Sequence, residues 1–126
     1  MARILLLDDS ASTLQLVEQM LATRGHQVQS VTDGLHGIAL LVANSYDLLV
    51  TDIYMPGADG IQIIRECRRL RPPVKILAMS ARDGHWNMLA TARVMGADAT
   101  IAKPFAQNEF LRQIDALLGA VPAAER

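Results

Sequence analysis

The segment LLVTDIYMPG, residues 48–57, is a run of apolar side chains that meets one carboxylate and then a proline and a glycine. A nearly continuous apolar run is typical of a strand that is buried on both faces, as in a parallel sheet. The proline and glycine that follow indicate a turn. Asp52 therefore stands where a buried strand is expected to leave the core.

Short apolar runs alternate along the chain with longer segments of helical periodicity. The expected strands cover residues 3–7, 27–31, 47–51, 74–79 and 99–102. The expected helices cover residues 12–24, 34–43, 59–70, 87–95 and 107–118. Strands and helices that alternate with short connections predict an α/β fold, in which helices cover both faces of a doubly wound, five-stranded parallel sheet.

Local signals predict where several helices begin and end. Ser12, Asp59 and Asn108 are the expected N-caps, because their side chains can accept hydrogen bonds from the first free backbone N–H groups. Gly25 and Asn44 are the expected stops of the first two helices.

Composition places the chain among single-domain globular proteins. Its 126 residues suit one core, and no apolar stretch approaches the ~20 residues of a membrane helix. The single cysteine, Cys67, excludes an intrachain disulfide and fits a reducing compartment, so we expect a cytoplasmic location. The one dense basic cluster, residues 65–71, is interpreted as the solvated face of a helix rather than a nucleic-acid site. We expect one domain over residues 1–120, followed by a short C-terminal tail, residues 121–126.

Polar residues stand at the carboxyl ends of four expected strands: Asp8 and Asp9, Asp52, Ser80, and Lys103. Ligands of doubly wound sheets bind at this edge, so the five side chains are expected to form one site. Three carboxylates without imidazole or thiolate partners favour Mg²⁺, a hard cation that takes oxygen ligands. One aspartate could then act as the nucleophile toward a phosphoryl group, while Lys103 and Ser80 neutralise the phosphoryl oxygens.

With these motifs the chain resembles the receiver domains of two-component response regulators, in the single-domain form typified by chemotaxis-type regulators. The resemblance is carried by RILLLDDS (3–10), VTDIYMPGADG (50–60), LAMSA (77–81) and GADATIAKPF (96–105). It implies that the receiver domain spans residues 1–120 and has the flavodoxin-like (βα)5 fold with strand order 2-1-3-4-5.

The resemblance also assigns roles to the acidic residues. Asp52 matches the phospho-acceptor, which takes its phosphoryl group from a phosphohistidine on a sensor histidine kinase or a histidine phosphotransfer protein. Asp9 matches the direct Mg²⁺ ligand, and Asp8 matches the ligand that acts through water. Asp52 and the backbone carbonyl of Tyr54 complete the implied protein ligands. Such a domain assists its own phosphorylation and dephosphorylation but is a signalling domain rather than an enzyme.

The remaining implied residues concern the switch. Ser80 matches the hydroxyl that turns toward the phosphoryl group, and Lys103 matches the phosphate-pairing lysine. Pro104 matches a proline whose preceding peptide bond is usually cis in this family. Thr100 occupies a position where the family pattern has an aromatic residue. Because threonine has no ring to move, the usual aromatic part of the switch is not expected here.

Two further residues are expected to flank the phosphoryl group. Tyr54 lies two residues after Asp52, and Arg82 lies two residues after Ser80. The bulk of Tyr54 is predicted to hinder attacking water and so to lengthen the phosphorylated lifetime. Trp86 is interpreted as packing on the fourth helix, with a partner-binding anchor as the alternative.

The leading functional prediction is a phosphorylation-switched module that contacts an unidentified downstream protein, without direct nucleic-acid or membrane contact. Its partner surface is expected to include Leu89, Val94, Ile101 and Gln107. A phosphate shuttle or sink is one alternative, and a receiver fragment of a larger hybrid kinase or transcription factor is another. A haloacid-dehalogenase-type phosphohydrolase is disfavoured, because Tyr54 stands where that family has a second acid.

Overall fold

The computed structural model describes residues 2–54, 57–70, 73–81 and 88–119. Within these ranges five strands and five helices alternate along the chain: β1 (Arg3–Leu7), α1 (Ala11–Ala22), β2 (Gln27–Val31), α2 (Gly34–Ala43), β3 (Leu48–Asp52), α3 (Gly60–Arg68), β4 (Lys75–Ala81), α4 (Met88–Met95), β5 (Ala99–Lys103) and α5 (Gln107–Leu117). All neighbouring strands pair in parallel in the order β2-β1-β3-β4-β5. The predicted doubly wound sheet and its strand order are confirmed.

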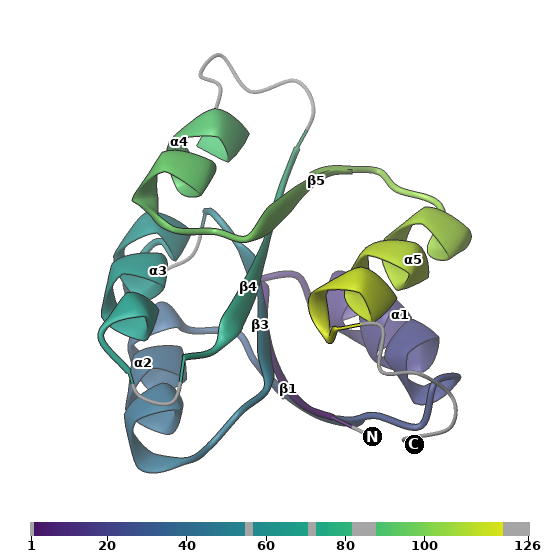
Figure 1. The fold of residues 1–126 in the computed structure, drawn as a ribbon, viewed down its shortest axis with the longest axis horizontal. Helices are drawn as coiled ribbons and strands as arrows, with labels where there is room; N and C mark the ends of the chain where they lie inside the picture. The colour runs from purple at the N-terminus through teal and green to yellow at the C-terminus, as the bar shows by residue number, and fades with distance from the viewer. Residues whose placement is uncertain (1, 55–56, 71–72, 82–87, 120–126) are drawn as a thin grey trace.

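The helices form two layers on the sheet (Figure 1). Helices α1 and α5 cover one face, and α2, α3 and α4 cover the other. Leu5 and Leu7 of β1 join the core beneath α2 to α4, whereas Ile4 and Leu6 join the core beneath α1 and α5. Burial on both faces explains why β1 is apolar without alternation, and every residue of β3 is buried for the same reason.

Two of the predicted N-caps are wrong and one is confirmed. The N-cap of α1 is Ser10, whose side chain accepts from the Thr13 N–H, because the helix begins one residue before Ser12. The N-cap of α5 is Ala106, which has no side-chain cap, and Asn108 already lies inside the helix. Asp59 caps α3 as predicted, by accepting from the Gln62 N–H at 2.9 Å.

Both predicted stops are confirmed. Gly25 adopts φ 76°, the left-handed region that favours glycine, after the end of α1. Asn44 is the C-cap of α2. None of the described helices is long and apolar enough to cross a membrane.

Candidate functional site

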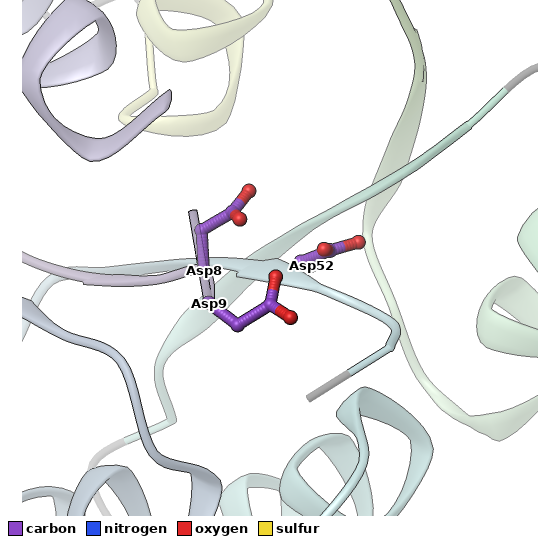
Figure 2. A group of neighbouring side chains, drawn as sticks. All are labelled: Asp8, Asp9 and Asp52. Carbon is purple, nitrogen blue, oxygen red and sulfur yellow. The ribbon is translucent and has the colours of Figure 1, made fainter. Parts of the chain in front are cut away.

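The parallel sheet brings three acids to one edge. Asp8 directly follows β1, and Asp52 is the last residue of the adjacent strand β3. Their carboxyl groups and that of Asp9 lie at neighbouring strand ends (Figure 2). One ligand oxygen from each residue can be chosen so that all three lie within 4.8 Å of one another. Asp8 and Asp52 are buried, with exposed fractions of 0% and 7%, whereas Asp9 is exposed.

Lys103 supplies a cation to this cluster. Its ammonium group donates to Asp8 Oδ2 at 2.6 Å and lies 3.4 Å from Asp52 Oδ2. Lys103 is the last residue of β5, and β4 lies between β5 and β3 in the sheet. The lysine side chain therefore extends past the end of β4 to reach the two acids. The lysine predicted to pair with a phosphoryl group is thus already at the carboxylates, and it offsets the cost of burying two acids.

At this edge the pKa of Asp52 and the pKa of Lys103 are both raised, for different reasons. Burial raises the pKa of Asp52, the ammonium of Lys103 opposes that rise, and the charge of Asp8 adds to it. Burial lowers the pKa of Lys103, but its hydrogen bond to Asp8 and the charge of Asp52 outweigh burial, so its pKa is raised. Lys103 therefore remains a cation at neutral pH.

Close backbone packing surrounds the described residues that follow Asp52, among them Ile53 and Ala58. The N–H of Gly60 donates to the carbonyl of Ile53 at 2.7 Å, and a Cβ on Gly60 would lie 2.5 Å from the Asp52 carbonyl oxygen. A Cβ on Gly34, the first residue of α2, would lie 1.9 Å from the Ala58 carbonyl oxygen. These glycines were not predicted to position the site. Only the Asp-Gly pairs at 33–34 and 59–60 gave a local sequence signal for them.

Of the other predicted residues, Ser80 lies near the same edge, whereas Thr100 lies three residues before Lys103 in β5. Ser80 is buried in β4 and pairs in register with Ala102. Thr100 is partly buried in β5, and the peptide bond between Lys103 and Pro104 is cis, as predicted. Tyr54 is 50% exposed immediately beyond β3. Arg82 and Trp86 lie outside the described residues.

The family model for the response regulator receiver domain matches residues 4–115. This chain belongs to that family. Receiver domains of two-component response regulators are signalling domains, and the acidic pocket of this receiver domain fits that membership.

Curated relatives of this receiver domain include longer regulators. The response regulator MprA of Mycobacterium sp. (strain KMS) is 34% identical over 116 residues, a match that covers 92% of this chain and 50% of that protein. The transcriptional regulatory protein TcrA of Mycobacterium tuberculosis is 33% identical over 115 residues, which are 91% of this chain and 45% of TcrA. The chain spans about half the length of the curated relatives it matches.

Experimentally determined structures share the fold. The receiver domain of sensor histidine kinase PA1611 from Pseudomonas aeruginosa superposes with a TM-score of 0.85 at 28% identity, covering 94% of this chain and 98% of that one. That structure has a magnesium ion coordinated in its active-site cleft. The chemotaxis response regulator CheY4 of Vibrio cholerae gives a TM-score of 0.82 at 24% identity, covering 93% and 98% of the two chains, and shows the common fold.

The predicted partner surface of this receiver domain is partly wrong. Val94 on α4 is 85% exposed and Gln107 at the start of α5 is exposed, as a surface role requires. Ile101 is only 3% exposed, because it packs in the core beneath α1 and α5. It therefore cannot contact a partner directly. The side chain of Leu89 lies outside what the structure describes.

Proposed function

We propose that Asp52 accepts a phosphoryl group from a phosphohistidine on a sensor histidine kinase or a histidine phosphotransfer protein, in the cytoplasm. One observation carries the proposal: a buried carboxylate at a strand end has two further carboxylates within 4.8 Å and an ammonium group at 3.4 Å. A phosphoryl acceptor needs this combination of a positioned oxygen nucleophile and compensating positive charge.

The transfer balances with the residues at hand. An Asp52 carboxylate oxygen attacks phosphorus, the new O–P bond forms, and the P–N bond to the donor histidine breaks. The departing imidazole keeps the electron pair of that bond. Lys103, already 3.4 Å from an Asp52 oxygen, pairs with the phosphoryl oxygens, and the Ser80 hydroxyl donates to one of them. Hydrolysis ends the signal: water attacks phosphorus, the bond between phosphorus and the Asp52 oxygen breaks, and inorganic phosphate leaves the restored Asp52 carboxylate.

The site suits a resident Mg²⁺. Its donors are carboxylate oxygens without imidazole or thiolate groups among the described residues, and this is the donor set that Mg²⁺ prefers. Asp8, Asp9, Asp52 and the backbone carbonyl of Tyr54 would hold the ion, with Asp9 the direct ligand and Asp8 acting through water. When bound, Mg²⁺ would neutralise charge on the three acids and on the phosphoryl oxygens. The magnesium in the PA1611 receiver domain supports this assignment by analogy.

The conformational response is proposed to begin at Ser80. Phosphorylation would draw its hydroxyl toward the new phosphoryl group, and the adjacent strand β5 would sense that movement at Thr100. Thr100 pairs in register with Ala78, two residues before Ser80. Because threonine cannot exchange an aromatic ring between buried and exposed positions, the response here must use smaller displacements than a ring flip.

Tyr54 is proposed to set the lifetime of the phosphorylated state. Its side chain is half exposed beside Asp52, where it can restrict the approach of water. Arg82 is proposed to flank the phosphoryl group from the other side. A Tyr54→Ala variant is expected to lose its phosphoryl group faster than the wild type, and equal decay rates would contradict this role.

The downstream event is proposed to be contact with a protein partner over a surface that includes Val94 and Gln107. Two alternatives have specific support. Thr100, in place of an aromatic switch residue, favours a phosphate shuttle or sink, which needs no output surface. The greater length of the curated relatives favours a receiver that works within a larger regulator or hybrid kinase.

The acceptor assignment is tested by labelling with acetyl phosphate, or with a phosphorylated kinase, in the presence of Mg²⁺. The wild type and an Asp59→Asn variant are expected to be labelled equally, because asparagine caps a helix about as well as aspartate. Asp52→Asn is expected to remain unlabelled. Equal labelling of Asp52→Asn, or a phosphoryl group that survives acid, would overturn the assignment.

A further inference from the structure

Helix α2 has an exposed apolar face that does not pack against the rest of the domain. Leu35 is 57% exposed and Val42 is 69% exposed, and among the side chains whose burial the structure describes no other helix presents two such large apolar residues to solvent. Ala39 is also exposed and lies between them in the sequence. The spacing i, i+4, i+7 places all three on one side of the helix, which we call the α2 outer face.

The opposite side of α2 already packs against the domain. Gly34, Gly37 and Leu41 are the buried residues of this helix. A Cβ on Gly37 would lie 2.5 Å from a Leu7 side-chain atom, so the helix sits directly on β1. The α2 outer face therefore contributes little to this core, and its apolar side chains are available for contact with another surface.

The scarcity of charged residues around α2 indicates which class of partner could bind the α2 outer face. A fifth of all residues are charged, yet across residues 25–46 the single charged residue is Asp33. Its carboxylate is engaged in capping α2, by accepting from the His36 N–H at 3.1 Å. Nucleic acids and anionic membranes are attracted by basic side chains, and residues 25–46 contain no lysine or arginine. An uncharged apolar protein surface therefore suits the α2 outer face better than a nucleic acid or an anionic membrane does.

We propose that the α2 outer face pairs with the same face of a second copy of this chain. A two-fold interface places like surfaces together, and an uncharged face does so without like-charge repulsion. Ala39, the smallest of the three side chains, lies near the middle of the face. With two antiparallel α2 helices, Ala39 would meet Ala39 at the axis, and Leu35 of each copy would pack against Val42 of the other. The small central residue permits the close approach of two helices.

The position of α2 also matters for whether a segment following α5 could cover the α2 outer face. Helix α2 lies on the α3 and α4 side of the sheet, whereas α5 lies on the opposite side (Figure 1). A segment continuing from α5 would therefore start on the face of the sheet opposite α2.

The size of the face predicts a reversible contact. Helix α2 has ten residues, which correspond to a length of about 15 Å. Its outer face alone is smaller than the roughly 800 Å² per partner that a stable interface buries. We therefore expect monomers at micromolar concentration and measurable dimers as the concentration approaches about 1 mM.

Sedimentation velocity of the unphosphorylated chain, over a concentration series up to about 1 mM, tests the pairing. Ala39→Glu places two carboxylates at the two-fold axis and is expected to raise the dimer dissociation constant by about tenfold or more. Ala39→Lys is expected to do the same. An equimolar mixture of the two variants is expected to recover dimerisation, because opposite charges then meet at the axis. Leu16→Glu, at a 52% exposed leucine on α1, is the matched control and should dimerise like the wild type.

Three outcomes would overturn the proposal. The first is a wild-type chain that stays monomeric at the highest concentration, which would leave the face to another occupant. The second is an Ala39→Glu variant that associates like the wild type. The third is a mixture of the Glu and Lys variants that fails to associate although both variants are folded by circular dichroism.

Discussion

Removing the charge of Asp9 should have opposite effects with and without Mg²⁺. Asp9 makes no hydrogen bond or ion pair with the described residues, whereas Asp8 and Asp52 are both paired with Lys103. An Asp9→Asn substitution therefore removes one negative charge from the cluster without breaking a contact. It also removes one of the proposed metal ligands.

The size of the effect follows from the spacing of the acids. Two unit charges 4.8 Å apart repel by about 1 kcal/mol in water and about 3 kcal/mol at the effective dielectric constant near a protein surface. Asp9 is exposed, so the lower value applies, and Lys103 offsets part of it. We expect Asp9→Asn to raise the free energy of unfolding of the metal-free protein by about 1 kcal/mol, or about 4 °C in Tm.

Magnesium should reverse the order of stability. An ion that binds only the folded wild type adds about 2 kcal/mol when its concentration is roughly twentyfold above its Kd. Asp9→Asn lacks one ligand and should gain much less. Urea unfolding in EDTA and in Mg²⁺ measures both free energies for each protein. Asp59→Asn makes the same charge change away from the cluster and should leave the response to Mg²⁺ unchanged.

An Asp9→Asn variant that is less stable than the wild type in EDTA would show that the three carboxylates do not repel one another as their spacing requires. Equal stabilisation of Asp9→Asn and the wild type by Mg²⁺ would show that Asp9 contributes nothing to binding the ion.

Three further predictions concern buried groups. Burial raises the pKa of the Cys67 thiol to about 11, so a thiol reagent at pH 8 should label the native protein slowly and the urea-unfolded protein at once; rapid native labelling would contradict its burial. Burial lowers the pKa of His26, which favours the neutral ring in the folded state; the resulting stabilisation should be complete above about pH 6.5 and decline as the pH falls below that value. Unfolding free energies of His26→Gln should show a shallower decline between pH 7 and 5, and an unchanged slope would refute the assignment. Gly34→Ala should cost about 2 kcal/mol or more and slow phosphorylation, because its methyl group would meet the Ala58 carbonyl oxygen. Gly25→Ala, at a positive φ with open space around the glycine, should cost about 1 kcal/mol and leave the phosphorylation rate unchanged, and equal slowing of both variants would contradict the packing argument.

The strands were predictable because a strand that is buried on both faces has a nearly continuous run of apolar residues. Strands β1 and β3 read as continuous apolar runs that stop at acids. Once parallel order is inferred, topology alone gathers Asp8, Asp52 and Lys103 at one edge. For this reason the geometry of the site followed from a few local signals.

Other features depend on contacts that local patterns do not encode. Ser12 and Asn108 are good capping residues, but the helices begin at Ala11 and Gln107, so the caps fall on different residues. Ile101 was expected on a partner surface, yet its burial depends on how α1 and α5 pack against β5. The close approach of Gly34 to Ala58 joins segments distant in sequence, and the Asp33-Gly34 pair, its only local signal, does not identify that partner.

Chemical trapping of the acyl phosphate tests the central claim most directly. Borohydride reduces an aspartyl phosphate to homoserine, so the modified residue can be located by peptide mass spectrometry after labelling with Mg²⁺ and acetyl phosphate. The account predicts homoserine at position 52, dependent on both Mg²⁺ and the phosphodonor. Homoserine at another aspartate, or a borohydride-resistant phosphate on Ser80, would contradict it.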